Sequence, residues 1–286
     1  MRVLRGSAGS WLREDRDSAL AVGVFDGLHS GHRAVLAELH AHAGRLGVVP
    51  GVVTFDPHPL AVVAPERAPA MITDLEQRLE LLAEMGLGLV AVVAFDEATR
   101  AWSPAEFALG LLADTLRARV VLAGKDFRFG RDRSGDVAVL RELGRSGGYE
   151  TVVVPLVGAG RPASSSALRA LIAAGDVAAV AAELTRPHEV RGVAHGSGGS
   201  LTVAVSPGMA VPGAGVYAGW AGKDAADWIP VVVRTGAGVV ALQVLDRAEN
   251  LEGARVRVRF VACIADGQSP VAELASARSL LAERGY

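Results

Sequence analysis

The first two thirds of the chain alternate short apolar runs with longer stretches of helical spacing. Five apolar runs predict buried strands: Ala19–Phe25, Val48–Phe55, Val90–Phe95, Val120–Ala123 and Val152–Pro155. Three intervening stretches predict helices: about Gly31–Leu46, Thr73–Met85 and Pro104–Leu116. Strands that alternate with helices favour right-handed crossovers and a parallel sheet. We therefore expect an α/β fold for this part of the chain.

Polar residues mark where two of these helices begin. Thr73 followed by Glu76 forms a capping pattern ahead of an amphipathic stretch. Ser103 stands where an N-cap is expected, and Pro104 occupies the first helical position, where its missing N–H costs nothing.

The pattern changes after about Pro187, where short β-rich segments follow one another between Gly/Pro turns. The segments are Glu189–Ala194, Leu201–Val205, Gly215–Trp220, Trp228–Val233, Val239–Leu245 and Arg255–Ile264. Short strands at regular spacing suggest a small closed barrel or a sandwich. A last helix is expected at about Pro270–Arg284. The boundary lies near Thr185–His188, which divides the chain into residues 1–186 and 187–286.

The last predicted strand, Arg255–Ile264, alternates arginines with apolar residues. Because side chains of a strand point alternately to its two faces, the three arginines are expected to point outward and the three apolar side chains inward. We interpret the arginines as a solvated strand face; a basic nucleic-acid patch is the alternative. Cys263, the one cysteine, lies in an apolar run and is expected to be a buried thiol.

Composition limits the classes of partner. The 286 residues carry 29 Lys+Arg and 31 Asp+Glu, and half of them are hydrophobic. This balance argues against nucleic acid or an anionic membrane as a partner, and against disorder. No signal-peptide core begins the sequence, and no apolar run of about 18 residues is present. We expect a soluble, cytoplasmic protein.

The strongest chemical signal is Gly23-Val24-Phe25-Asp26-Gly27-Leu28-His29-Ser30-Gly31-His32, where the first strand ends and a helix begins. Helix N-termini bind anions, and ligands bind at the carboxyl ends of parallel strands. Gly27 and Gly31 let the backbone approach a phosphate. His29 and His32 can both donate hydrogen bonds to one phosphate chain. A zinc pair and an incidental turn are the alternatives.

This segment resembles the nucleotidyltransferase signature of the bacterial bifunctional riboflavin kinase/FAD synthetase family. Three further stretches resemble that family in order and spacing: Val53–Pro59, Gly124–Gly130 with Gly135-Asp136, and Ala163–Arg169 with Gly175-Asp176. The four motifs extend over about 150 residues. The resemblance implies a Rossmann-like nucleotidyltransferase domain, followed by a small β-barrel domain of riboflavin-kinase type.

The resemblance also implies site residues. The catalytic candidates are His29, His32 and Arg169. The nucleotide-binding candidates are Gly23, Phe25, Asp26, Gly27, Gly31, Asp126, Ser164, Ser165 and Ser166. The acceptor-binding candidates are Phe55, Asp56, His58 and Phe129. Simple readings stay open beside these: helix capping at Ser164, a plain loop acid at Asp126, a structural histidine at His58 and a core position at Phe129. No metal ligands are identified.

The activity that the resemblance implies is FMN adenylyltransferase, with Mg²⁺, ATP and FMN giving FAD and pyrophosphate. An adenylyl transfer to another phosphorylated or carboxylated small molecule is the alternative within the same chemistry. A non-catalytic nucleotide- or flavin-binding protein is the alternative of another class. Small-molecule substrates are the expected partners, with no nucleic acid and no membrane, and a homo-oligomer stays open.

The second part departs from the family. Arg191–Gly196, Gly215–Ala218 and Leu251–Val256 resemble stretches of the kinase module. Where that module has Pro-Thr-Ala-Asn, this chain has Ser200–Val205. Aligning the family's Leu-Leu-Asp on Val244-Leu245-Asp246 puts Ala241 at the position of the catalytic glutamate. Alanine accepts no proton, so we predict that riboflavin kinase activity is lost.

Overall fold

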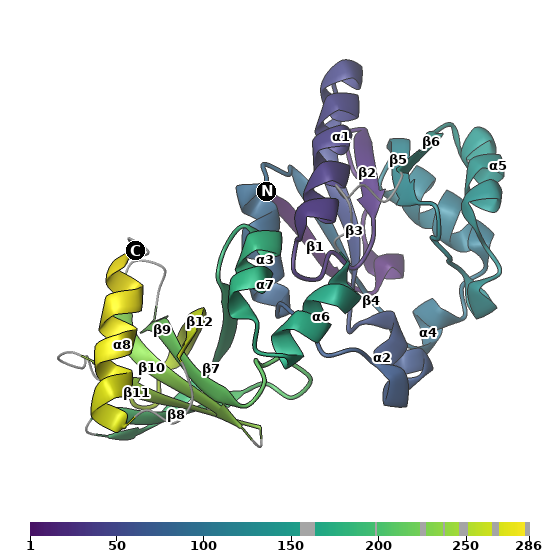
Figure 1. The fold of residues 1–286 in the computed structure, drawn as a ribbon. Helices are drawn as coiled ribbons and strands as arrows, with labels where there is room; N and C mark the ends of the chain where they lie inside the picture. The colour runs from purple at the N-terminus through teal and green to yellow at the C-terminus, as the bar shows by residue number, and fades with distance from the viewer. Residues whose placement is uncertain are drawn as a thin grey trace. The chain divides into compact units, whose positions relative to one another are not determined.

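The computed structural model describes residues 1–154, 164–197, 199–223, 227–236, 238–245, 251–264 and 269–283. The chain forms two compact units (Figure 1). The first comprises Met1–Pro69 and Leu75–Pro162, and the second comprises Ala70–Asp74 and Ala163–Tyr286. Pro155, Ala163, Asp246 and Arg284, which the sequence analysis used, lie outside the described residues.

The first unit contains a six-stranded sheet in the order β1-β4-β3-β2-β5-β6, with every neighbouring pair parallel. Its strands are β1 (Arg2–Gly6), β2 (Ser18–Val22), β3 (Val49–Asp56), β4 (Leu89–Ala94), β5 (Ala118–Gly124) and β6 (Glu150–Val154). The predicted α/β class with a parallel sheet is confirmed. The edge strand β1 was not predicted.

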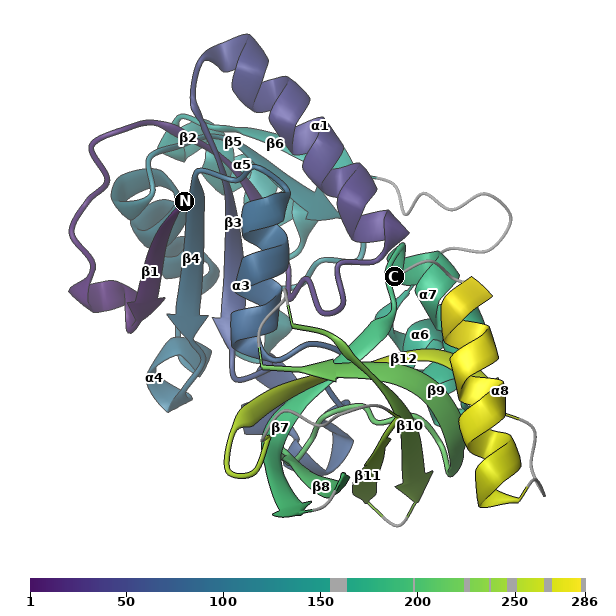
Figure 2. The same cartoon turned by 90° about the vertical axis from the view of Figure 1, so that its left-hand side faces the viewer.

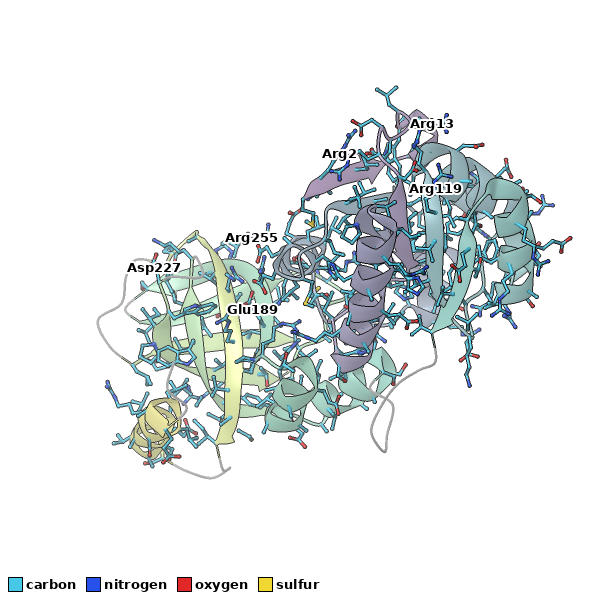
Figure 3. The ribbon with its side chains drawn as sticks, turned by 90° about the horizontal axis from the view of Figure 1, so that it is seen from above. Arg2, Arg13, Arg119, Glu189, Asp227 and Arg255 are labelled. Atoms are coloured by element: carbon cyan, nitrogen blue, oxygen red, sulfur yellow. The ribbon has the colours of Figure 1, made fainter. Side chains whose placement is uncertain are left out.

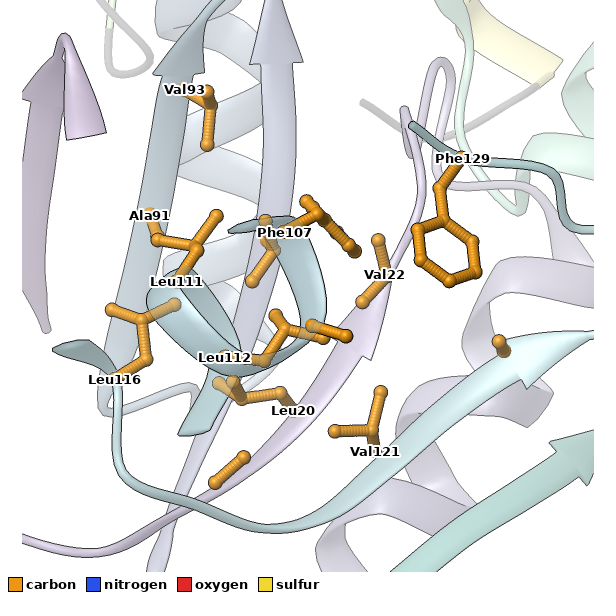
Figure 4. Packing of buried hydrophobic residues seen from close by; sticks show 14 of the residues in the cluster. Leu20, Val22, Ala91, Val93, Phe107, Leu111, Leu112, Leu116, Val121 and Phe129 are labelled. Atoms are coloured by element: carbon orange, nitrogen blue, oxygen red, sulfur yellow. The ribbon is translucent and has the colours of Figure 1, made fainter. Parts of the chain in front are cut away.

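Helices cover both faces of this sheet (Figure 2). On one face, apolar side chains of α1 (Ser30–Leu46) and α3 (Leu75–Glu84) pack on the strands. On the other face lie the π-helix η3 (Glu106–Thr115) and α5 (Val137–Gly147), with Phe107, Leu111 and Leu112 of η3 packed around Leu20 (Figure 4). The short helices are η1 (Ala8–Ser10), α2 (Pro59–Val63), η2 (Pro65–Arg67), α4 (Glu97–Arg100) and η4 (Arg131–Arg133).

The predicted start of the third helix is confirmed by a capping box. The Ser103 amide donates to Glu106 Oε2 at 2.7 Å, and the Glu106 amide donates to Ser103 Oγ at 3.2 Å. Both groups would otherwise be unpaired at the helix start. The body of the helix has π geometry, which the apolar spacing did not predict.

The second unit is built on a closed antiparallel barrel in the order β10-β11-β8-β7-β12-β9. Its strands are β7 (His188–Ser197), β8 (Ser200–Val205), β9 (Gly215–Gly222), β10 (Ile229–Gly236), β11 (Val239–Val244) and β12 (Arg255–Ile264). The helix α8 (Pro270–Glu283) packs Ala277 and Leu281 against Val232 and Val261. The predicted barrel is thus confirmed over the predicted sandwich.

Two further helices, α6 (Ser165–Ala173) and α7 (Val177–Leu184), belong to the second unit by their contacts. They precede the expected boundary at 186/187, so a division of the chain at that point stays a prediction. Within the described ranges, no helix is long and apolar enough to cross a membrane.

The outward face of β12 corrects one interpretation. Val256, Val258 and Phe260 point inward and are fully buried, as alternation predicts. Arg255 is solvated, with 64% of its side chain exposed, but Arg257 and Arg259 are only 19% and 26% exposed. Each of these two donates through Nε to the Glu189 carboxylate, at 2.9 and 3.0 Å.

Glu189 (Figure 3) is only 4% exposed, although it too points away from the barrel interior. Burial raises the pKa of its carboxyl, but the hydrogen bonds and charges of its arginine partners, Arg257 first, outweigh burial and keep the pKa below its ordinary value. The carboxylate is therefore the shared anion of this outward face. Arg259 also lies over the Trp228 ring, 4.0 Å from its centroid.

The expectation for Cys263 is wrong: its side chain is exposed. The register of β12 against β9 shifts between Phe260 and Ala262. At this irregularity three consecutive residues, Phe260, Val261 and Ala262, are buried, so the alternation is interrupted. As a result Cys263, and not Ala262, lies on the exposed side.

Candidate active site

The segment Gly23–His32 occupies the topological switch point of the parallel sheet. From β2 the chain continues to β3 on one side, while β5 pairs with β2 on the other. Crevices at the carboxyl ends of strands at such points are where open α/β sheets bind ligands. The helix α1 begins here at Ser30, so the positive end of its dipole lies at this edge of the sheet. An anion is therefore the ligand this position suits.

The turn between β2 and α1 has an unusual backbone. Phe25 (φ 54°), Gly27 (φ 82°) and Leu28 (φ 43°) all adopt left-handed conformations. Glycine adopts such a φ at no cost, but phenylalanine and leucine do not. The side chains of Phe25, Asp26 and Leu28 are buried, and the Gly23 amide donates to the Val53 carbonyl at 3.1 Å. Packing thus holds the turn in a conformation that its local sequence disfavours.

His29 and His32 lie against each other at the start of α1. Their rings stack with centroids 3.7 Å apart and planes 20° apart. His29 is the N-cap, because its Nδ1 accepts a hydrogen bond from the His32 amide at 3.3 Å. An Nδ1 that accepts leaves the proton of the neutral ring on Nε2, where it can be donated. The structure thus brings the two histidines together, and their predicted role toward a phosphate chain stays a prediction.

The protonation of this pair follows from its surroundings. Burial lowers the pKa of His32 well below its ordinary value, and the neighbouring His29 lowers it further. At neutral pH His32 is therefore an uncharged ring with one N–H to donate. An approaching phosphate would favour protonation, so the pair can gain positive charge when an anion binds.

The segment after β3 carries three acceptor-binding candidates. Phe55 is partly buried and contacts Phe95 and Phe107, with centroids 5.9 and 6.5 Å away. Asp56 is 48% exposed and joined to Pro57 by a cis peptide bond. His58 caps α2 by accepting the Leu60 amide at 3.1 Å on Nδ1. The simple structural reading of His58 is thus observed, and its predicted role toward an acceptor stays a prediction.

The segment after β5 contains Asp126 and Phe129. Asp126 is exposed in a turn, whereas Phe129 is buried and its ring packs 5.3 Å from Phe107. Phe129 and Gly135 exchange two backbone hydrogen bonds, and a Cβ on Gly135 would lie 2.8 Å from the Phe129 ring. Only glycine fits at that close approach. Asp136 then caps α5 by accepting the amides of two following residues.

The serine-rich segment belongs to the second unit. Ser164 Oγ accepts the Ala167 amide at 3.2 Å and so caps α6, which is the simple reading of this serine. Ser165 and Ser166 form the first helical turn. Arg169 Nε donates to the Ala70 carbonyl at 2.6 Å. The candidates therefore fall into two groups: Gly23–His32, Phe55–His58, Asp126 and Phe129 in the first unit, and Ser164–Arg169 in the second.

Comparison with known proteins decides the family. The model of the FAD synthetase family matches residues 12–168, more than half of the chain. The chain belongs to the FAD synthetase family. The matched stretch contains all of the candidate residues in the first unit and extends to Leu168 in α6, one residue before Arg169.

Curated relatives of this FAD synthetase family member carry two activities in their names. A bifunctional riboflavin kinase/FMN adenylyltransferase of Escherichia coli K12 is 34% identical over 198 residues, which cover 68% of this chain and 63% of the relative. That match spans less than two thirds of the relative's length. The protein of the same name from Pseudomonas fluorescens is 34% identical over 263 residues, with 86% and 84% covered.

Another relative, the putative bifunctional enzyme of Geobacillus thermodenitrificans, is 38% identical over 159 residues, which cover 56% of this chain and 84% of the relative. Among solved structures, the macrolide-efflux protein of Streptococcus pneumoniae superposes with a TM-score of 0.81 at 19% identity. The superposition covers 99% of this chain and 97% of that protein. The two proteins share a fold.

Two residues beside the site were missed by sequence reasoning. Thr54 Oγ1 and Arg78 Nη1 both donate to the Val24 carbonyl, at 2.9 Å each. Their partner lies 30 and 54 residues away in sequence. A signal for Arg78 was present: it stands between Leu75 and Leu82 on the apolar face of α3, where an arginine is out of place.

Among the described residues, no three or more His, Cys, Asp or Glu side chains are placed to hold a metal ion. The zinc alternative for His29 and His32 therefore gains no third ligand there. Magnesium needs no such cage, because it keeps several waters and is held largely by substrate phosphates.

Proposed function

We propose that the protein is an FMN adenylyltransferase, which transfers AMP from ATP to FMN and releases pyrophosphate. Membership of the FAD synthetase family and the names of the relatives support this activity. The observation that carries it is the stacked pair of His29 and His32 at the start of α1, at the switch point of the sheet. Phosphate chemistry is what this arrangement can serve.

The reaction needs no covalent enzyme intermediate. A phosphate oxygen of FMN forms a bond to the α-phosphorus of ATP, while the bond from that phosphorus to the bridging oxygen of the β-phosphate breaks. Pyrophosphate leaves with the electron pair of that bond. His29 and His32 donate hydrogen bonds to phosphate oxygens where negative charge accumulates, and the first amides of α1 add to them. Gly27 and Gly31 leave room for the close approach.

The remaining candidate residues are assigned to the two substrates, ATP and FMN. Ser164, Ser165 and Ser166 offer hydroxyls and helix-end amides to the β- and γ-phosphates, and Arg169 offers a guanidinium suited to the same anion. Gly23, Phe25, Asp26 and Asp126 contribute to the nucleotide site. Phe55, Asp56, His58 and Phe129 contribute to the acceptor site.

Magnesium would bind as part of the ATP substrate and neutralise charge on its phosphates. The other partners are small molecules, in a cytoplasmic enzyme.

The riboflavin kinase activity is absent in this proposal. Ala241 on β11 pairs with Thr202 of β8 and with Arg234 of β10, so no carboxylate stands at the position aligned with the catalytic base. Arg234 itself is ion-paired to Glu273 of α8. In this proposal the barrel keeps its fold, while Ala241 offers no group that could remove a proton from riboflavin.

A panel of acceptors tests the proposal against its alternatives. Purified protein with Mg²⁺ and ATP is supplied in turn with FMN, riboflavin and other phosphorylated or carboxylated metabolites, and pyrophosphate release is followed. Release that depends on FMN supports the proposal. Release only with another acceptor would show that this acceptor, and not FMN, is the substrate. Nucleotide or flavin binding without release under any condition supports a non-catalytic binding protein instead.

A further inference from the structure

Arg78 is a buried arginine that joins two segments of the candidate site. Its side chain is 1% exposed on α3. Nη1 donates to the Val24 carbonyl at 2.9 Å, and Nη2 donates to the Phe55 carbonyl at 3.4 Å. Nη2 also lies 3.7 Å from Asp56 Oδ1. One guanidinium therefore connects the turn after β2 to the end of β3.

The Val24 carbonyl is held from two sides. It accepts the Thr54 hydroxyl as well as Arg78, both at 2.9 Å. It immediately precedes the left-handed residue Phe25, and Leu28 follows with the same backbone sign. Such conformations persist in non-glycine residues only where the surroundings impose them. The two donors are the polar part of that restraint, and Phe25 in turn lies 5.2 Å from the His32 ring.

The choice of arginine at this position is informative. Burying a cation is costly, so an apolar side chain would serve stability at least as well on this face of α3. Arginine provides five donors in a rigid planar fork, which a lysine cannot match when two separate carbonyls must be bonded. The β2–β3 ladder fixes the strands up to the bond from the Gly23 amide to the Val53 carbonyl, and the fork extends that link to the carbonyls of Val24 and Phe55.

We propose that Arg78 is a positioning residue for adenylyl transfer: it fixes the turn that places His29 and His32, and it couples that turn to the Phe55–His58 segment. Arg78 acts through the backbone and not on the substrate. The proposal rests on the proposed function for its kinetic consequence. Its structural consequence, the placement of the two imidazoles, can be measured without any activity.

The test compares Arg78→Lys and Thr54→Val with the parent and with Arg117→Lys. Arg117 pairs with Asp17 at the amino-terminal edge of the same sheet, so it controls for the loss of an ion-paired arginine away from the site. Two quantities are measured: kcat and KM for FAD formation, and the pKa of each histidine ring followed by NMR. Both variants keep a side chain of similar size, and folding is checked by circular dichroism.

Arg78→Lys is expected to lower kcat by about tenfold or more with KM changed less than about threefold, because misplacement acts on the reaction step. The pKa of His32 should rise toward that of an exposed imidazole as the turn loosens. Thr54→Val should shift the same pKa in the same direction, and it serves alone if Arg78→Lys fails to fold. Arg117→Lys should change neither quantity.

Parent-like kcat and histidine pKa values in a folded Arg78→Lys protein would overturn the proposal. So would equal losses in Arg78→Lys and Arg117→Lys, because these would indicate general destabilisation. If the parent forms no FAD, the proposed function fails, but the pKa comparison still decides whether Arg78 places the histidines.

Discussion

The ring of His32 stacks on that of His29 at 3.7 Å, and the backbone amide of His32 donates to the Nδ1 of the same partner. The spacing of three residues across a helix start produces both contacts at once. The hydrogen bond on Nδ1 fixes one tautomer of His29. Burial, with His29 beside it, lowers the pKa of His32 and keeps this ring uncharged at neutral pH. This pair is the centre of the proposed phosphate chemistry, and its protonation yields the first prediction.

Stability should fall as the pH is lowered below about 6.5. The pKa of His32 is depressed in the folded protein, so between the folded and unfolded pKa values the unfolded chain binds more protons than the native one. The free energy of unfolding therefore decreases as pH falls through this window, and levels off once the native ring is also protonated. Urea unfolding at pH 7.5 and 5.5 measures the difference.

His32→Gln, which does not titrate, is the control for that experiment. The decrease between the two pH values should be smaller in this variant than in the parent. An equal decrease in both proteins would mean that another group is responsible.

Removal of the His32 ring should separate binding from reaction. His32→Ala is expected to keep ATP binding within a few fold, because helix-end amides remain, while pyrophosphate release falls by about 10²–10³-fold, the usual effect of losing one hydrogen bond to a charge that develops in the transition state. Calorimetry with ATP and a pyrophosphate assay measure the two quantities. A variant with unchanged turnover would remove His32 from the mechanism.

Glu189 should be far more important to stability than its position on the outside of a barrel suggests. Replacing Glu189 by Gln leaves Arg191, Arg257 and Arg259 around a neutral amide. Breaking a buried ion pair by removing one partner costs about 3–5 kcal/mol, so the free energy of unfolding should fall by that order. Urea unfolding measures it.

Glu97→Gln, at an exposed ion pair with Arg100, is the matched control and should have little effect. Equal, small effects of the two substitutions would show that the Glu189 cluster is not a stabilising element.

Tyr149→Phe should be neutral or stabilising. Tyr149 is 5% exposed, its hydroxyl has no hydrogen-bond partner among the described residues, and burial raises its pKa. An unpaired buried hydroxyl carries a desolvation cost of about 1–3 kcal/mol, which removal of the oxygen relieves in part. Thermal unfolding of the variant checks this. A clear loss of stability would indicate that the hydroxyl has a partner such as a buried water.

Much of the fold was predictable because the strands of the first sheet are buried on both faces. Such strands are continuous apolar runs, and β2 to β6 were identified from them. The edge strand β1, Arg-Val-Leu-Arg-Gly, is short and carries two arginines, so it gave no such run. The helices α5 and α7 each begin at an aspartate N-cap, Asp136 and Asp176, but neither cap was used to predict a helix.

The candidate site was predictable where its contacts are local. The His29–His32 pairing and the cap at Ser164 each join residues three apart. The contacts of Arg78 and Thr54 with Val24 depend on which strands are neighbours, and this order is not readable from apolar periodicity. The same holds for Arg257, whose partner Glu189 lies 68 residues away on β7. Alternation predicted its direction but not its partner.

Formation of FAD from FMN is the most direct test of the proposed activity. The purified protein is incubated with Mg²⁺, ATP and FMN, and flavins are separated by chromatography while pyrophosphate is quantified. FAD and pyrophosphate should form in equal amounts, and a parallel reaction with riboflavin in place of FMN should give no FMN. Absence of FAD at high protein concentration, with FMN and ATP both intact, would contradict the account.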